Sequence, residues 1–386
     1  MKKILAITTI RSDYDLMSGL YKLLNQDPEI NFQLLVAGAH LSRNYGHTVD
    51  LIKKDGFSIL AEIENLIDSD STKSRLKTAS ILLQNSIDVV DNFSPDLILY
   101  AGDREDVLIG GMLSTYLQIP SIHFFGGDHE KDGHADTVVR HATSKLSTAH
   151  IVSIEEHRKR LIKMGEAASR VFVTGSIALD KFIQHKPLNW EELKLNFPTA
   201  KNLKDYALVI YHPVDDEKLV ADQYFQNILE ELKSRNIPAI VSYPNTDPGN
   251  FKIIEKIKEY ESDSNFWFYK NLNRDLFLSV FKMSKFIIGN SSAGIMEAAS
   301  IPISAINVGL RQRGRLAGAN VIFCDSDRKS ISDAINESLT PSFLEKVKNL
   351  SNIYGDGKSC EKAYQIIKKT DFNKMRLKME DPLDVT

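Results

Sequence analysis

A segment in the second half of the chain, FIIGNSSAGIMEA at residues 286–298, combines residue types that bind a phosphate. An apolar run leads into Gly-Asn-Ser-Ser, and Ala-Gly then opens a predicted helix whose free N–H groups and positive end would face an anion. Ser291 and Ser292 can add hydroxyl donors, and Glu297 could accept hydrogen bonds from both hydroxyls of a ribose. The alternatives are that the serines only cap the helix and that Glu297 is a solvated surface carboxylate.

A second group of candidate ligand-binding residues is basic. The loop GLRQRGR, residues 309–315, holds Arg311 and two further arginines among small residues, and guanidinium groups bind phosphate or carboxylate in a bidentate manner. Arg11 follows the first apolar run of the chain, and His212 follows another in the motif YHPVDD. In isolation the loop could equally be a solvated surface and His212 a structural histidine. Their shared position after apolar runs favours a ligand site.

Acid and base groups gather in the first half of the chain. The apolar run Asp96–Ala101 leads into AGDRED, which places Asp103 at a strand end, where a carboxylate could react with a ligand or only cap the next helix. The segment HFFGGDHEKDGHADTVVRHATSKLS, residues 123–147, then supplies four further candidates for proton transfer: Asp128, Glu130, Asp136 and His141. The spacings in this segment match no metal-binding signature. We therefore predict a Gly-rich loop with general acid and base groups, followed by a helix from about Asp136.

These candidate residues need a scaffold that places strand ends side by side, and the apolar patterning predicts one. Short β-branched runs alternate with amphipathic stretches such as Asp15–Asn25 and Ser80–Asn92. The predicted strands are Lys3–Thr9, Phe32–Ala37, Asp96–Ala101, Ser121–Phe124, His150–Ser153, Val171–Thr174, Ala207–Tyr211, Ala239–Tyr243, Phe286–Gly289, Ile303–Asn307 and Val321–Phe323. This alternation is typical of parallel sheets covered by helices on both faces.

The strand–helix pattern restarts after the polar stretch His185–Asp205, which predicts an α/β fold with two Rossmann-like doubly wound domains facing a central cleft. We place the N-terminal domain at residues 1–184 and the second domain at residues 185–358. Residues 359–386 are expected to form a helix that returns to the first domain and a charged, loose tail after Asn373. Because ligands of such folds bind outside the carboxyl ends of the strands, the cleft is the expected site.

The composition limits the class of protein. The chain has 386 residues, 42% hydrophobic and 26% charged, with a formal net charge of -3, which does not favour a nucleic-acid or membrane partner. Its two cysteines, Cys324 and Cys360, are too few for a disulfide framework or a thiolate metal site. The first residues, MKKILAITTIRSDYD, contain an apolar run that is too short for a signal peptide or a membrane span. A cytoplasmic enzyme is therefore expected.

In their order and spacing, these segments resemble the hydrolysing UDP-N-acetylglucosamine 2-epimerases. That family includes bacterial enzymes of sialic acid, legionaminic acid and capsule polysaccharide pathways and the epimerase half of a human bifunctional enzyme. The resemblance covers roughly residues 1–370 and is carried by IRSDYDLM, AGAHLSRNYG, AGDRED, GGD with DTVVRHATSKLS, YHPV, YPNTDPGN, GNSSAGIMEA and GLRQRGR. Each motif alone is weakly specific, whereas their joint order indicates the family.

The resemblance implies a GT-B-like fold with the nucleotide mostly on the second domain. Carried over to matching positions, it implies the following ligand contacts: Ser291 and Ser292 with the pyrophosphate, Glu297 with the ribose, Arg11 and His212 with the diphosphate, and Asn245, Asp247 and Arg311 close to the ligand. It also implies that Asp103 and Asp136 are the catalytic carboxylates and that His141 belongs to an Arg-His pair. A UDP-sugar is the implied partner, with no cofactor or metal, in a homodimer or homotetramer.

The implied reaction has two stages. UDP is first eliminated across C1–C2 of the sugar to give a 2-acetamidoglucal, and water is then added at C1 while a proton returns to the opposite face of C2. Two proton-transfer groups are needed because the proton leaves one face and returns to the other. The products are UDP and the free sugar with C2 inverted, which is N-acetylmannosamine from the usual substrate.

One position departs from the family pattern. Before the Gly-Gly pair the family usually has Glu or His, whereas this chain has Phe125, followed after the glycines by Asp128. Either Asp128 or Glu130 has taken over a proton-transfer role, or Phe125 packs on a less polar sugar such as a 6-deoxy-2,4-diacetamido sugar. A non-hydrolysing 2-epimerase, a GT-B glycosyltransferase and a non-catalytic sugar-nucleotide sensor remain alternatives.

Overall fold

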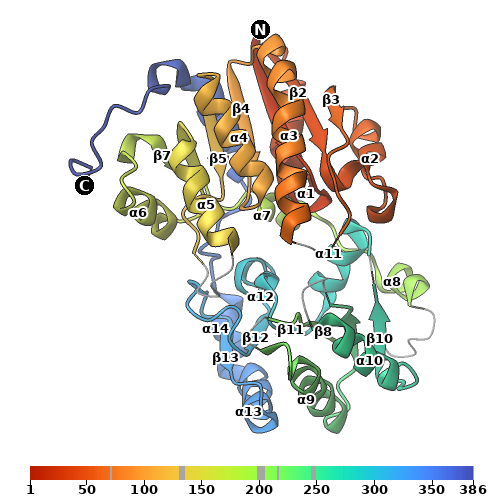
Figure 1. Ribbon diagram of the computed structural model, residues 1–386. Coiled ribbons are helices and arrows are strands. Elements are labelled where there is room, and N and C mark those ends of the chain that lie inside the picture. The colour runs from red at the N-terminus through yellow and green to blue at the C-terminus, as the bar shows by residue number, and fades with distance from the viewer. Residues whose placement is uncertain are drawn as a thin grey trace. The chain divides into compact units, whose positions relative to one another are not determined.

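The protein folds into two compact units. The computed structural model describes residues 1–69, 72–129, 135–197, 205–214, 217–244, 249–270 and 272–385. Unit 1 consists of Met1–Lys181 together with Tyr354–Thr386, and unit 2 is Phe182–Ile353. Each unit is built around a parallel sheet with helices between successive strands, which confirms the predicted α/β class and doubly wound arrangement (Figure 1).

The sheet of unit 1 has the strand order β3-β2-β1-β4-β5-β6-β7 in the described residues. Its strands are β1 (Lys2–Thr8), β2 (Ile30–Ala37), β3 (Ile59–Ile63), β4 (Leu97–Ala101), β5 (Ser121–Phe124), β6 (Ala149–Val152) and β7 (Val171–Val173). Along β1, Ile4 and Ala6 pack into the core on one face of the sheet, and Leu5 and Ile7 into the core on the other. The strand is apolar without alternation because both of its faces are covered.

The helices of unit 1 cover both faces of this sheet. They are α1 (Arg11–Gln26), α2 (Val49–Lys54), α3 (Thr72–Phe93), α4 (Glu105–Tyr116), α5 (Ala135–Leu146), α6 (Glu155–Lys163), α15 (Ser359–Lys369) and α7 (Ala178–Gln184), within which the chain passes to unit 2. Helices α1, α2 and α15 supply apolar side chains to one core, and α3 and α4 to the other. Figure 1 shows α3, α4 and α5 side by side over one face.

Two helices of unit 1 begin earlier than their apolar periodicity predicts. Helix α1 begins at Arg11 rather than Asp15, because Asp13 in its first turn accepts hydrogen bonds from the Thr9 backbone N–H and the Thr8 hydroxyl. Helix α3 begins at Thr72 rather than Ser80, since its first turns are polar and give no apolar period. Strand β3 was not predicted, because this edge strand is only partly buried.

Helix α15 and residues 371–380 contact the rest of unit 1, so these residues do not form the loose tail that was predicted after Asn373. Helix α15 packs on α1, and its Tyr364 hydroxyl and Lys368 ammonium both bind the buried carboxylate of Asp27. Beyond it, residues 371–380 form a segment named here the C-terminal strap. The guanidinium of Arg170 is almost fully buried beneath the strap, donates to the Leu377 carbonyl and pairs with Glu380. A buried cation of this kind orders the tail, because it must keep its partners.

The sheet of unit 2 has the strand order β10-β9-β8-β11-β12-β13 in the described residues. Its strands are β8 (Ala207–Ile210), β9 (Ala239–Ser242), β10 (Phe266–Tyr269), β11 (Phe286–Gly289), β12 (Ser304–Val308) and β13 (Val321–Cys324). Its helices are α8 (Trp190–Asn196), α9 (Ala221–Ser234), α10 (Asn250–Tyr260), α11 (Arg274–Met283), α12 (Ser292–Met296), α13 (Arg328–Ser338) and α14 (Pro341–Lys348). Strand β10, at the sheet edge, was not predicted.

The strand order of each sheet contains one point where the direction of winding reverses. In unit 1 this point lies between β1 and β4, and in unit 2 between β8 and β11. Ligands of open parallel sheets bind at the carboxyl ends of the strands at such points. Arg11 and Asp103 follow β1 and β4, and His212 and Ser291 follow β8 and β11, so the fold positions all four at these reversals.

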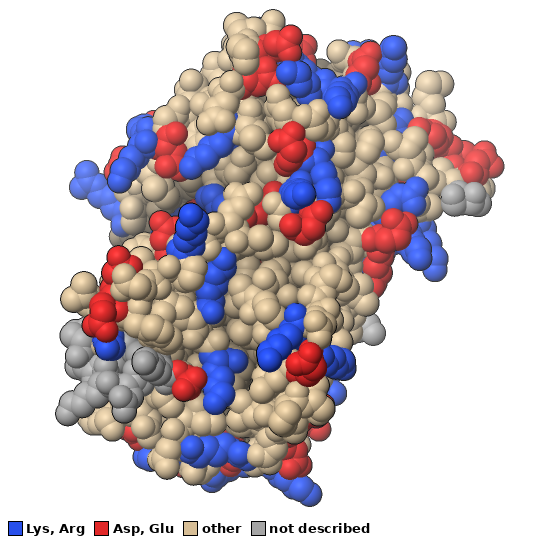
Figure 2. Space-filling view, turned by 180° about the vertical axis from the view of Figure 1, so that it is seen from behind, with Lys and Arg blue, Asp and Glu red and all other residues tan. Residues whose placement is uncertain are grey.

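Two properties of the molecule bear on its partners. On the face shown in Figure 2, Lys and Arg side chains are interspersed with Asp and Glu side chains rather than gathered into one broad basic area. In the part of the chain that the structure describes, no helix is both long enough and apolar enough to cross a bilayer.

Candidate active site

An ion pair joins the candidate residue Asp103 to a buried arginine at the carboxyl edge of the unit 1 sheet. Arg140 of α5 has a side chain that is only 5% exposed, and its guanidinium donates to the carboxylate of Asp103 in the turn after β4. Its other terminal nitrogen lies 3.9 Å from Asp128. Sequence reasoning selected His141 but not Arg140 as a site residue, although Arg140 makes the contact with Asp103.

The second predicted carboxylate, Asp136, also has an arginine partner. Arg75 of α3 lies 3.4 Å from the Asp136 carboxylate and 2.6 Å from Glu105, which begins α4 two residues after Asp103. Arg75 therefore links the first turns of α4 and α5. Arg75 could not be selected from the sequence, because it lies 61 residues from Asp136 in a polar stretch.

Histidines surround Asp128. His157 lies 3.4 Å from its carboxylate, and the Nδ1 of His129 lies 3.3 Å from the Nε2 of His141, with the two rings stacked. Burial, followed by the neighbouring His129, lowers the pKa of His141. Glu130 lies outside the described residues. Among the residues that are described, no group of three or more His, Cys, Asp or Glu side chains is arranged to hold a metal ion.

Phe125 has an unusual backbone conformation. Its φ of 65° lies in the left-handed region, which a bulky residue rarely adopts. The following glycines explain part of this turn, because a Cβ on Gly127 would lie 2.4 Å from the His157 carbonyl oxygen. The Phe125 ring is partly buried against the apolar core of unit 1. An unfavourable conformation retained at a strand end is a reason to suspect a functional role.

The buried His123 connects the Asp103 turn to α5. Its Nε2 lies 2.8 Å from the carbonyl oxygen of Gly102, and its Nδ1 lies 3.1 Å from the Ser144 hydroxyl. Burial lowers the pKa of His123 to about 3, so the imidazole is neutral at pH 7. A neutral ring that bonds on both sides has a structural role beside the carboxylates.

At the carboxyl edge of the unit 2 sheet, Asn290 connects three loops. Its side chain, 1% exposed, accepts from the His212 backbone N–H and donates to the His212 carbonyl. Its own carbonyl accepts from Arg311 at 3.1 Å and from Gln312 at 3.3 Å. Sequence reasoning missed Asn290, which lies between the selected residues of the motif. Through it the structure brings His212, Ser291 and Arg311 together.

This close approach of loops requires glycine at position 289. Gly289 has a φ of +136°, and a Cβ there would lie 2.0 Å from the carbonyl oxygen of Ile210 in the neighbouring strand. No side chain fits at this distance. The glycine thus lets β11 and β8 end side by side, with Asn290 against His212.

His212 and Arg311 have different charges at neutral pH. Burial, followed by the nearby Arg311, lowers the pKa of His212 to about 3. His212 is therefore a neutral hydrogen-bonding group at pH 7. The positive charge that could bind a diphosphate at this edge belongs to Arg311.

The predicted phosphate-binding serines begin α12. The Ser291 Oγ accepts a hydrogen bond from the Ala293 backbone N–H at 3.2 Å, so the capping alternative describes one of its bonds. The hydroxyl hydrogen can still serve as a donor to a ligand. Ser292 is the first residue of the helix. Because α12 ends at Met296, Glu297 is its C-cap.

Glu297 and Arg11 differ in their surroundings. Glu297 lies 3.8 Å from Arg274, and burial raises its pKa although Arg274 opposes this effect. Arg11 is 42% exposed and lies 3.5 Å from Asp15 one turn later in α1. Two further predicted ligand residues, Asn245 and Asp247, lie outside the described residues.

Comparisons with known proteins identify the family of this chain. A family model described as UDP-N-acetylglucosamine 2-epimerase matches residues 22–368. A UDP-N,N'-diacetylbacillosamine 2-epimerase (hydrolyzing) of Legionella pneumophila is 36% identical over 368 residues, covering 95% of this chain and 96% of the relative. A UDP-N-acetylglucosamine 2-epimerase of Neisseria meningitidis serogroup B is 31% identical over 340 residues, covering 88% of both chains.

A solved structure agrees with the fold. The crystal structure of UDP-GlcNAc 2-epimerase from Neisseria meningitidis bound to UDP-GlcNAc matches with a TM-score of 0.80 over 95% of this chain and 100% of that chain, at 18% identity. That identity supports the GT-B-like fold alone. Together with the family match over most of the chain, these findings show that the protein belongs to the UDP-N-acetylglucosamine 2-epimerase family and is a UDP-sugar 2-epimerase.

Proposed function

We propose that this protein is a hydrolysing 2-epimerase, which converts a UDP-2-acetamido sugar and water into UDP and the free sugar with inverted C2. With UDP-N-acetylglucosamine the sugar product would be N-acetylmannosamine. The observation that carries the proposal is the pair of carboxylates at the unit 1 sheet edge. Asp103 and Asp136 come from different elements, and each has an arginine partner, Arg140 and Arg75 respectively.

In the first stage, a carboxylate takes the C2 proton, the C1–C2 double bond forms, and the C1–O bond breaks with its electron pair going to UDP. Loss of the leaving group puts positive character on C1 and makes the C2 proton easier to remove. Arg311 and the hydroxyls of Ser291 and Ser292 would stabilise the negative charge that develops on the departing diphosphate. His212 would contribute hydrogen bonds but no charge, because its pKa is lowered to about 3.

In the second stage, the hydroxyl of water adds to C1 and a proton is delivered to C2 from the opposite face. This step needs a second acid–base group on the other side of the sugar. Asp103 and Asp136 are our candidates for the two groups, with Asp128 and Glu130 as further acids in the same segment. No hydride moves, so the reaction requires no redox cofactor.

Release of the free sugar, rather than return of UDP to it, is supported by the Legionella relative. Its description as hydrolysing accompanies 36% identity over nearly the whole of both chains.

The family resemblance also predicts a homodimer or homotetramer, which sedimentation of the purified protein would test.

A second candidate substrate is a UDP-2,4-diacetamido-2,4,6-trideoxy sugar. Phe125 favours this candidate, because it stands where the family pattern has a polar residue and its backbone is held in the left-handed region. An aromatic surface suits the C6 methyl group better than the C6 hydroxyl of N-acetylglucosamine. The description of the Legionella relative as acting on diacetylbacillosamine points the same way.

Proton and phosphorus NMR in D2O tests both the reaction and the substrate. The protein is incubated separately with UDP-N-acetylglucosamine and with the UDP-diacetamido sugar. We expect free UDP and a free 2-epimer that carries deuterium at C2. A 2-epimer still attached to UDP would overturn the hydrolytic assignment, and a strong preference for UDP-N-acetylglucosamine would overturn the role of Phe125.

A further inference from the structure

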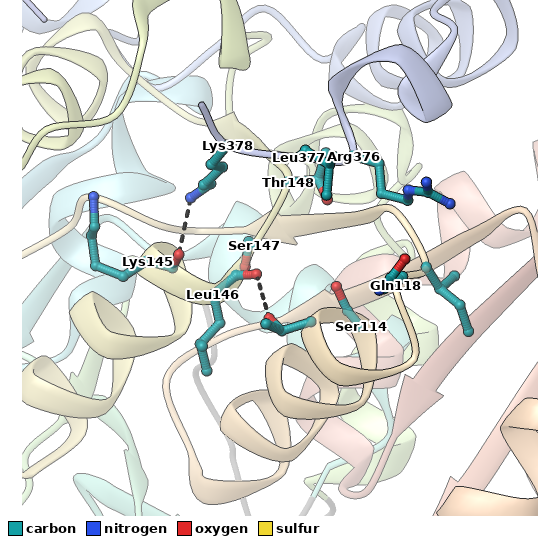
Figure 3. A pocket seen from close by; sticks show the side chains of 11 residues that line it. Ser114, Gln118, Lys145, Leu146, Ser147, Thr148, Arg376, Leu377 and Lys378 are labelled. Carbon is teal, nitrogen blue, oxygen red and sulfur yellow. Dashed lines mark hydrogen bonds between the residues drawn. The ribbon is translucent and has the colours of Figure 1, made fainter. Parts of the chain in front are cut away.

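The C-terminal strap lies over the end of α5 that is remote from the candidate carboxylates. It is fixed to unit 1 by Arg170, whose guanidinium donates to the carbonyls of Thr148 and Leu377 at 3.1 and 2.9 Å. Between Arg376–Lys378 of the strap and the ends of α4 and α5 there is a pocket of about 270 Å³ (Figure 3). The strap therefore does not contact the ends of α4 and α5 through continuous apolar packing, and its contacts with the α5 carbonyls there are polar.

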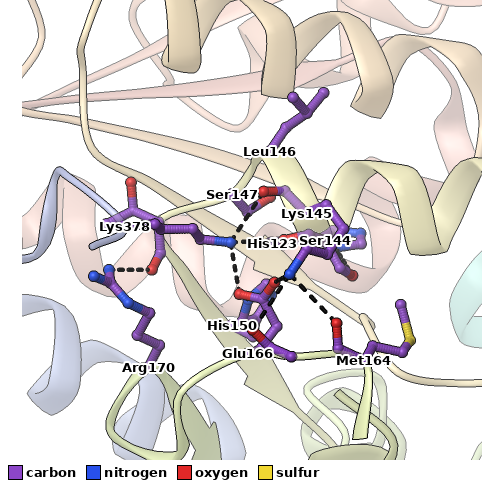
Figure 4. Close-up of polar contacts among 12 residues, drawn as sticks. His123, Ser144, Lys145, Leu146, Ser147, His150, Met164, Glu166, Arg170 and Lys378 are labelled. Carbon is purple, nitrogen blue, oxygen red and sulfur yellow. Dashed lines mark hydrogen bonds and ion pairs between the residues drawn. The ribbon is translucent and has the colours of Figure 1, made fainter. Parts of the chain in front are cut away.

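Lys378 of the strap makes the polar contacts with α5. Its ammonium donates to the carbonyls of Ser144 and Lys145 at 3.2 and 3.1 Å, and it lies 2.6 Å from the carboxylate of Glu166 (Figure 4). The two carbonyls belong to the last turn of α5, where carbonyls have no partner within the helix and the helix dipole is negative. Lys378 thus caps α5 from a position more than 230 residues later in the chain.

Glu166 fixes Lys378 in this position. Its side chain is 1% exposed and also lies 2.8 Å from Lys145 and 3.0 Å from His150. Burial raises the pKa of Glu166, but the bond to His150 and the two lysines lower it more, to about 2. The carboxylate is therefore charged at pH 7. A buried carboxylate is stable only while it is paired, so the ion pair between Glu166 and Lys378 is costly to break. This ion pair therefore keeps Lys378, and with it the strap, in place.

The capped helix leads to the catalytic candidates. Ser144, whose carbonyl binds Lys378, bonds through its hydroxyl to His123, which in turn bonds to the Gly102 carbonyl directly before Asp103. Towards its other end, α5 carries Arg140, the partner of Asp103, and Asp136. The helix is about 18 Å long at 1.5 Å per residue. A shift at its capped end would therefore move Asp136 itself and Arg140, the partner of Asp103.

We propose that Lys378 is a positioning residue of the 2-epimerase reaction. Through the cap on α5 it sets the position of Asp103 and Asp136 relative to each other, without touching the substrate. The inference rests on the proposed assignment of these two carboxylates to proton transfer. It does not depend on which sugar is bound or on whether UDP is released.

Three substitutions test the inference. Lys378→Met removes the charge and the donors while keeping a flexible chain, and Lys378→Arg restores both. Lys374→Met is the matched control, because Lys374 lies near the strap's start, is 85% exposed and, within the described residues, forms an ion pair only with exposed Asp371 at 3.6 Å. For each protein, kcat and KM are measured with a sugar nucleotide that the wild type converts, together with the UDP dissociation constant and the melting temperature.

We expect Lys378→Met to lower kcat about tenfold, as small displacements of reacting groups do, while KM and UDP affinity stay within about twofold. Lys378→Arg should regain most of the lost kcat, and Lys374→Met should resemble the wild type. A lower melting temperature with an unchanged kcat, measured where the variant is folded, would show that the strap only stabilises unit 1 and would overturn the inference.

A second variant keeps the test decisive if Lys378→Met does not fold. Ser144→Ala leaves the strap in place and cuts the bond from α5 to His123, so kcat should fall with little change in KM. An unchanged kcat in Ser144→Ala would overturn the inference in that case.

If the wild type releases no UDP from either nucleotide and forms no 2-epimer, the proposed function itself fails. Turnover by the wild type with no effect of these variants refutes only the positioning role.

Discussion

The two sheet edges hold their candidate residues in different ways. In unit 1, Asp103 and Asp136 each form an ion pair with an arginine. In unit 2, Asn290 makes four hydrogen bonds that connect His212 to the loop carrying Arg311, and its own side chain is neutral. The difference fits the two tasks that we propose, because proton transfer needs ionisable groups, whereas diphosphate binding needs donors and cations held in fixed positions. Substitutions at the two edges should therefore change different measured quantities.

The largest effect is expected at the unit 1 edge. Asp103→Asn removes a proton-transfer group and weakens the bond to Arg140, so kcat should fall by roughly 100- to 10,000-fold. UDP affinity should stay within about twofold, because the nucleotide is assigned to unit 2. UDP release and calorimetric UDP binding measure the two quantities. Asp91→Asn, at an exposed position on α3, is the control and should keep wild-type activity. A kcat of Asp103→Asn above a tenth of the wild-type value would contradict the proposed difference between the two edges.

At the unit 2 edge the opposite pattern is expected. Asn290→Ala leaves the His212 backbone N–H and carbonyl without their partner, which should cost about 2–3 kcal/mol of unfolding free energy. UDP affinity should fall by roughly tenfold, equivalent to about 1.4 kcal/mol. Urea denaturation and calorimetry measure these effects, with Asn349→Ala as an exposed control. Loss of kcat with unchanged UDP affinity would contradict the assignment of this edge to the nucleotide.

A buried carboxyl group of unit 1, that of Asp106, should make the stability of the protein depend on pH. Burial and then the nearby Asp13 raise the pKa of Asp106 to about 7, from 3.8 in the unfolded chain. The neutral carboxyl therefore favours the fold at low pH, and this contribution is lost as the pH rises from 3.8 through 7. Asp106→Asn cannot ionise and should gain roughly 2.5 kcal/mol relative to the wild type between pH 5 and pH 8. Urea denaturation measures the unfolding free energy of both proteins at each pH. If the difference between variant and wild type is the same at pH 5 and pH 8, this account is wrong.

The smallest effect is expected at the exposed pair of Arg11 and Asp15. Asp15→Asn should change the unfolding free energy by less than about 0.5 kcal/mol, because surface ion pairs contribute little. If Arg11 contacts the diphosphate, its release from Asp15 should leave UDP affinity unchanged or slightly higher. A clear fall in UDP affinity would assign Asp15 a direct part in the site.

The sequence predicted the placement of single residues better than the contacts between them. Asp103, His212 and Ser291 were predicted to follow strands, and they do, because a buried parallel strand is a continuous apolar run that can be recognised within one segment. Arg75 and Asn290 were missed, since their importance comes from partners 61 and 78 residues away. The short edge strands β3 and β10 escaped prediction because partial burial weakens their apolar pattern.

Contacts between residues far apart in the chain also explain why the prediction for the tail failed. Its charges suggested a loose segment, yet Lys378 and Glu380 find buried partners that no local pattern reveals. The roles assigned to individual site residues stay predictions until the substitutions above are made.

The division of unit 1 into two pieces of chain has a consequence for protein synthesis. The core beneath α1 includes Cys360, Ala363 and Ile367 of α15, which the ribosome adds only after it has completed residues 182–353 of unit 2. At roughly 5–20 residues per second, that delay is on the order of 10–35 s. During this interval the nascent chain exposes the apolar groove that α15 will fill. The first unit to begin synthesis is thus the last to be completed, and a ribosome that stops early leaves an apolar surface open to aggregation.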